Sequence, residues 1–195
     1  MNYTIACILS TVVLGFLFKQ FAGKNMSISK IVLINYLVCS LIGIIQVGFD
    51  VFNFTKFGSA LSAALIGVLF VAGFNAFGNA VALNGLSLAT IVQKMSVGLT
   101  VILAILIGEK LNNFQWAGFL LSLLAILVIF YKRDAKENIL KHEYGRVFLL
   151  ATLILSTIIE FGFLLIHKKE VYDIEFEWVF TARVFISASL TSIIY

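Results

Sequence analysis

The chain has 195 residues, of which 61% are hydrophobic and 12% are charged, and its formal net charge is +4. A soluble domain is about 45–50% apolar and about 25% charged, so this composition excludes a soluble globular fold and indicates a membrane protein. The basic residues mostly flank long apolar runs, where they report orientation, so the positive charge does not indicate a nucleic-acid partner.

Long apolar stretches predict helices that cross a membrane, because about 20 apolar residues span its hydrocarbon core. In chain order the predicted spans are 3–21, 29–49, 59–82, 86–108, 114–131, 146–166 and a seventh that opens near 177. The first stretch lacks a basic start and a small-residue cleavage site, so it is predicted to be a retained span. The predicted fold class is all-α, a polytopic transmembrane helix bundle in the plasma (inner) membrane.

An internal repeat organises these spans. Ile8-Leu9-Ser10-Thr11 recurs as Ile154-Leu155-Ser156-Thr157, and Gly15-Phe16 recurs as Gly162-Phe163, at an offset of 146 or 147 residues. Five spans precede the second copy, and an odd number of crossings inverts it relative to the first. The predicted organisation is a first repeat at 1–131, a polar linker at 132–145 and the start of a second repeat at 146–195. We expect a partial chain, with about seven of ten helices present.

Residues 82–131 include Ala82-Leu83, Gly108-Glu109-Lys110-Leu111, Gln115 and Gly118. In these positions the segment resembles the EamA-type half of the drug/metabolite transporter superfamily. The resemblance implies a secondary transporter built from paired repeats, with an internal amino terminus. The chain departs from the family pattern in two places: it has no proline, so the fourth-helix proline is absent, and Asn35-Tyr36 stands where Arg-Phe is usual.

The charges of the loops indicate the membrane orientation opposite to the one that the resemblance implies. Eight basic residues lie on the side that the first span reaches and four on the side of the amino terminus, while Lys94 and Arg183 lie inside spans. An excess of lysine and arginine marks the cytoplasmic side, so this count favours an external amino terminus. Orientation therefore stays open.

Lys94 is the most informative polar residue, since it lies half-way through the predicted span 86–108. A lysine at the bilayer centre costs about 2.5–3.5 kcal/mol on insertion scales, and such residues face a cavity or pathway. A tight turn at Asn84-Gly85 would place Asn75 level with it across a helical hairpin. The candidate substrate-binding residues are Lys94, Asn75, Asn79, Gln93 and Thr90. The alternative is a structural seam in which these polar groups join two helices.

Glu160 and Arg183 form a second candidate site inside the predicted membrane region. Each lies seven residues inside the same membrane side, counted from His167 and Phe176, so the two are predicted to be level and to interact. Three roles stay open for them: a substrate-facing carboxylate, a structural ion pair, or a proton-coupling site.

Several chemistries have no signature in the sequence. There is no Gly-rich phosphate loop with a lysine, no cluster with metal-ligand spacing and no nucleophile with a matching base. We therefore expect no enzymatic activity, no metal and no cofactor. The predicted function is a secondary carrier that exports or imports a small polar metabolite by alternating access, with a proton or sodium as the candidate coupling ion. The alternative is a flippase of lipids or amphiphiles, or a membrane partner subunit without its own transport pathway.

Overall fold

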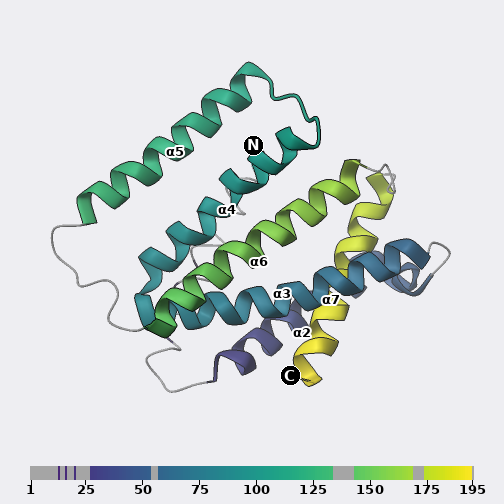
Figure 1. Cartoon of the computed structure of the whole chain (residues 1–195). Coiled ribbons are helices and arrows are strands. Elements are labelled where there is room, and N and C mark those ends of the chain that lie inside the picture. Colours follow the sequence, from purple (N-terminus) through teal and green to yellow (C-terminus); the bar gives the residue numbers. More distant parts are fainter. Residues whose placement is uncertain are drawn as a thin grey trace.

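The computed structural model describes residues 13, 16, 20, 27–53, 57–133, 143–168 and 174–194. Within these residues every secondary-structure element is a helix, which confirms the predicted all-α polytopic bundle (Figure 1). Most of the first predicted span 3–21, including the Ile8-Leu9-Ser10-Thr11 motif, and most of the linker 132–145 lie outside the described residues. The elements are α2 (Ile28–Val47), η1 (Gly48–Phe52), α3 (Phe57–Asn84), α4 (Leu86–Leu106), α5 (Asn113–Arg133), α6 (Glu143–Lys168) and α7 (Ile174–Ile194).

Five segments among the described residues are long and apolar enough to cross a membrane. They are Ile28–Phe52, Ala60–Asn84, Leu86–Leu106, Tyr144–His167 and Glu177–Ile194. Large apolar side chains point outward from these helices and the turns that join them, as lipid contact requires: Phe49 is 90% exposed and Ile45 is 83% exposed. The protein is therefore an integral, multi-pass membrane protein.

Two glycines with positive φ delimit α4. Gly85, at φ 83°, is the single residue between α3 and α4 and confirms the predicted turn. Gly108, at φ 87°, ends α4: its N–H bonds to Ile105 O, and the N–H of Glu109 bonds to Ala104 O. This pair of bonds is a Schellman motif, which satisfies carbonyls that a helix end leaves without partners. The motif ends α4 two residues before the predicted limit of the span.

α3 lies at the centre of the bundle and contacts α2, α4, α6 and α7. It runs antiparallel to α6, because Gly162 lies against Ile66 while Asn84, much further along α3, contacts Gly145 at the start of α6. α4 turns back directly from α3, so α4 and α6 run in the same direction. Figure 1 shows these two helices side by side.

Small residues allow α7 to approach its neighbours closely. Gly67 of α3 lies against Ser187, whose hydroxyl donates to Ala64 O over 3.1 Å, and Gly43 of α2 lies against Ala182. Without water in a membrane interior, close backbone approach and van der Waals packing hold helices together.

An aromatic cluster fills the space between α2, α3, α6 and α7. Its members are Tyr36, Phe70, Phe74, Phe163 and Phe185, with ring centroids 5.8–6.4 Å apart in mostly edge-to-face pairs. Tyr36 is 1% exposed, and its hydroxyl has no hydrogen-bond partner among the described residues.

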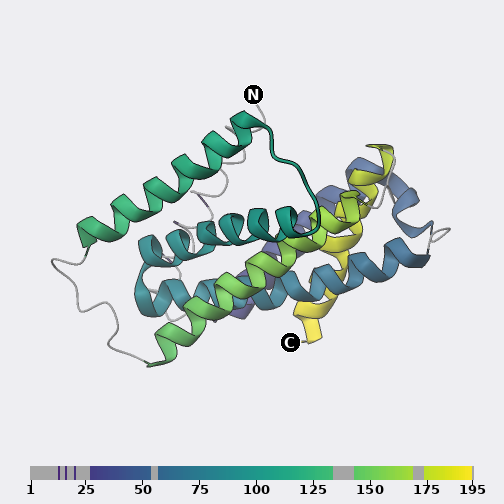
Figure 2. The ribbon, with the colours of Figure 1, turned by 45° about the horizontal axis from the view of Figure 1, so that its top comes forward.

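α5 lies at the edge of the bundle. Its Phe119 and Leu123 lie near Gly98 of α4. Figures 1 and 2 show it set apart from α3, α6 and α7, with α4 between.

Candidate functional site

Glu160 of α6 contacts two hydroxyl groups of α4. Ser96 Oγ lies 2.8 Å from Glu160 Oε1, and Thr100 Oγ1 lies 3.0 Å from Oε2. Ser96 is fully buried and Thr100 is 8% exposed, while the glutamate is half-buried. Residues 96 and 100 are one turn apart and share a face of α4, which lets both reach one carboxylate. The site therefore joins the fourth helix to the sixth.

Each of these hydroxyls has a second acceptor in its own helix. Ser96 Oγ also lies 2.5 Å from Gln93 O, and Thr100 Oγ1 lies 2.9 Å from Ser96 O. A hydroxyl carries one proton, so it donates either to the carboxylate or to the carbonyl at a given moment. The contact between α4 and α6 thus has two available hydrogen-bond arrangements.

Lys94 lies on a different side of α4. It is exposed, whereas Ser96 is fully buried, and two helical residues correspond to a rotation of about 200°. Thr90, one turn before Lys94, shares its side and donates to Leu86 O over 2.8 Å. Gln93 is half-buried, and its carbonyl oxygen is an acceptor for Ser96.

Asn75 and Asn79 are bound within and beside α3. Asn75 Oδ1 accepts a 3.2 Å hydrogen bond from Ser29 of α2, and its Nδ2 donates to Val71 O. Asn79 Nδ2 donates to Asn75 O over 2.8 Å. These bonds lead toward α2 and along α3. The structure therefore places Asn75 at the α2–α3 contact and Lys94 on the exposed side of α4.

Arg183 of α7 binds the connection between α2 and α3. Its Nε donates to Val51 O over 2.9 Å, and its Nη2 donates to Asn53 O over 2.6 Å. The side chain is 8% exposed. A guanidinium stabilises the carbonyl groups that helix ends leave unbonded, so Arg183 fixes η1 against α7. The contacts of Glu160 with α4 and of Arg183 with Val51 and Asn53 lead to different elements, and the ion pair between the two residues stays a prediction.

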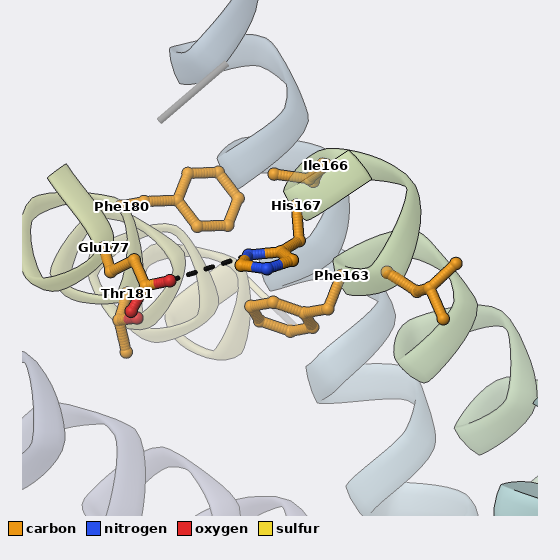
Figure 3. A pocket seen from close by; sticks show the side chains of 7 residues that line it. Phe163, Ile166, His167, Glu177, Phe180 and Thr181 are labelled. Atoms are coloured by element: carbon orange, nitrogen blue, oxygen red, sulfur yellow. Dashed lines mark ion pairs between the residues drawn. The ribbon is translucent and has the colours of Figure 1, made fainter. Parts of the chain in front are cut away.

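A cavity of about 440 Å³ lies between α6 and α7. Figure 3 shows the His167 imidazole and the Glu177 carboxylate pointing toward each other between the rings of Phe163 and Phe180. The distance from His167 Nδ1 to Glu177 Oε1 is 3.7 Å. No sequence pattern predicts the contact between His167 and Glu177, because it depends on how two helices face each other.

Ser96 and Thr100 were also not among the sequence-predicted site residues. The available signal was a pair of hydroxyls one turn apart in an apolar span. That signal is weak because serine and threonine occur in most of the predicted spans.

A family model described as "EamA-like transporter family" matches residues 2–131. No curated protein and no solved structure matches the chain. The matched residues include α2 to α4 and nearly all of α5, and with α4 the residues Ser96 and Thr100 that contact Glu160.

Proposed function

Because the chain belongs to the EamA-like transporter family, we propose that it is a secondary transporter that moves a small polar metabolite by alternating access. The observation that supports this most is the Glu160–Ser96–Thr100 contact inside the membrane spans. Its two sides come from the segments that the sequence assigns to the first and second repeats. Transporters with inverted repeats bind substrates and coupling ions near the membrane midplane, where the repeats meet.

We assign the substrate contact to Lys94, with Thr90 on the same side of α4. The further candidate residues are Gln93, next to Lys94 in the sequence, and Asn75 and Asn79 on the adjoining helix α3. The exposed lysine lies in the middle of an apolar span, eight residues after Leu86. An ammonium group in lipid is costly, so a pathway containing water or substrate suits it better than hydrocarbon. An ammonium also favours a substrate with a carboxylate, phosphate or carbonyl group.

The test is an uptake assay in proteoliposomes with labelled amino acids, nucleosides and sugar derivatives. Uptake that saturates with concentration supports the transporter. Lys94→Met should abolish uptake while insertion and thermal stability stay normal, because it keeps the length of the side chain and removes the charge. Lys110→Met is the matched control, since this lysine is exposed just after α4, outside the span. Wild-type uptake by Lys94→Met would remove Lys94 from the pathway.

One observation favours the second candidate, a flippase of amphiphiles. The cavity between α6 and α7 has apolar walls and a polar pair formed by His167, at the end of α6, and Glu177, near the beginning of α7. An amphiphile has the same combination of an apolar body and a polar head. Movement of fluorescent lipids between leaflets of the same vesicles tests this function. Lipid movement without metabolite uptake would favour the flippase over the carrier. The absence of both activities would favour a partner subunit.

A further inference from the structure

We propose that Glu160 is a proton-binding site whose charge state controls the contact between α4 and α6. As a carboxylate it accepts hydrogen bonds from Ser96 and Thr100, and as a carboxylic acid it releases at least one of them. The proposed role in coupling rests on the transporter function, whereas the protonation itself does not.

The position of Glu160 suits proton exchange inside the membrane region. It lies within the candidate span Tyr144–His167, seven residues before its end, or about 10 Å from that boundary. Its partners Ser96 and Thr100 lie near the middle of the span Leu86–Leu106. Ionisable groups at such depth are costly and mark ion pathways and proton relays.

The geometry favours a proton over a metal cation. The hydroxyl oxygens lie 2.8 and 3.0 Å from the carboxylate oxygens, which are direct O–H···O distances. In that arrangement the hydroxyl protons occupy the space between the oxygen atoms. A cation bound there would have to separate these atoms and turn both protons away.

The second acceptor of each hydroxyl provides the switch. When Glu160 is charged, both hydroxyls donate to it, since a bond to an ionised acceptor is about twice as strong as a neutral one. When Glu160 takes up a proton, its own O–H donates to one hydroxyl oxygen. The hydroxyls of Ser96 and Thr100 can then return to Gln93 O and Ser96 O in their own helix. Protonation therefore weakens the link between the two helices.

Few other charged groups can control this titration. Residues 57–84, which form α3, include no charged residue. On α4 the charged residue is Lys94, about 200° around the helix from Ser96. On α7, Arg183 binds carbonyl groups of the α2–α3 connection and Glu177 lies by His167. On α6 itself, the charged or titratable groups nearest to Glu160 are His167 and Arg146, two and four turns away.

The experiment measures protonation directly, by labelling the purified full chain with a membrane-soluble carbodiimide over a range of pH. The reagent adds across the O–H of a protonated carboxyl: the oxygen bonds to the carbodiimide carbon and the proton moves to nitrogen. The adduct rearranges to a stable N-acylurea, which mass spectrometry locates. Labelling at Glu160 should rise as the pH falls, with a defined midpoint, and should be lost in Glu160→Gln.

Variants of the two hydroxyls test the switch. Each hydroxyl gives the carboxylate one hydrogen bond, so Ser96→Ala and Thr100→Val should each change the labelling midpoint. Thr152→Val is the matched control, because Thr152 is equally buried in α6 but donates to Phe148 O. An unchanged midpoint in Ser96→Ala and in Thr100→Val would overturn the proposal.

Two further measurements complete the test: the labelling of Glu160 in the presence of sodium, and the uptake by the same protein. If sodium at constant pH lowers the carbodiimide labelling of Glu160, the site binds a cation and the proposal is overturned. If the wild-type protein transports but the labelling of Glu160 does not change with pH, the proton site is rejected and the transporter function stands. If the labelling of Glu160 changes with pH but the protein shows no uptake, the proton site stands and the transporter function is rejected.

Discussion

Asn84 donates a hydrogen bond from Nδ2 to Gly145 O over 3.0 Å and so joins the end of α3 to the beginning of α6. The same nitrogen lies 3.3 Å from Ala80 O, which holds the side chain in place. A Cβ atom at position 145 would lie 2.7 Å from Asn84 Oδ1, so only glycine allows this approach. The connection orients the first helix after the linker relative to the central helix.

Gly145→Ala should lower the stability of the protein by about 1 kcal/mol, because Asn84 must move and lose its bond to the carbonyl oxygen. Thermal unfolding of the purified protein in detergent measures this change. Gly118→Ala is the control, since a Cβ there meets nothing within 4 Å. An unchanged unfolding temperature in Gly145→Ala would show that the contact contributes nothing to stability.

Gly67→Ala should be more damaging, at about 1–3 kcal/mol. Its Cβ would lie 2.7 Å from Ser187 Cβ and 2.8 Å from the backbone oxygen of Val184, and neither atom can swing aside as the end of a side chain can. Gly98→Ala serves for comparison, because its nearest neighbours would be at ordinary contact distances of 3.8 and 3.9 Å. Equal unfolding temperatures for the two variants would contradict the close crossing of α3 and α7.

Tyr36→Phe should stabilise the protein or leave it unchanged. The buried hydroxyl has no partner among the described residues, and an unsatisfied buried group costs about 1–3 kcal/mol. Phenylalanine keeps the ring contacts with Phe74 and Phe185. Tyr144→Phe, at a side chain that is 75% exposed, is the neutral control. A marked loss of stability in Tyr36→Phe alone would reveal a partner for the hydroxyl.

A double-mutant cycle with Glu160→Gln and Arg183→Met tests the ion pair that the sequence predicts. Arg183→Met alone should cost about 2 kcal/mol or more, because it leaves the carbonyl groups of Val51 and Asn53 without a charged donor. If the ion pair forms, the cycle should give a coupling of about 0.5–3 kcal/mol. Additive effects would contradict the pair and leave each residue with the partners described above.

Membrane topology offers a test of the repeat. In a background with Cys7 and Cys39 replaced by serine, the variants Asn2→Cys and Glu137→Cys should react with a membrane-impermeant thiol reagent from opposite sides of the membrane. Five crossings separate these positions in the predicted first repeat. Reaction from the same side would remove the odd number of crossings on which the inversion depends.

The helices could be predicted well because the length of an apolar run is set by membrane thickness. The predicted spans 59–82 and 86–108 correspond to α3 and α4, and Gly85 provides the turn between them. The sequence predicts the end of α4 two residues too late, since the apolar run continues past Leu106 but the Schellman motif at Gly108 ends the helix.

The partners of the polar residues were much harder to predict. Depth along a span follows from residue number, and it placed Glu160 level with Arg183 and Asn75 level with Lys94. Rotation about the helix axis does not follow from residue number, because lipid-facing and core-facing positions are equally apolar in a membrane helix. The structure supplies this rotation and turns Glu160 toward Ser96 and Thr100.

The shared direction of α4 and α6 determines what α5 does. A chain that leaves α4 on one membrane surface must return to the other before it can begin α6 in the same sense. The segment between them therefore makes an odd number of crossings, and α5, with 21 residues, is long enough for one. α5 is thus the described helix of this segment that can make the crossing, although it lies at the edge of the bundle.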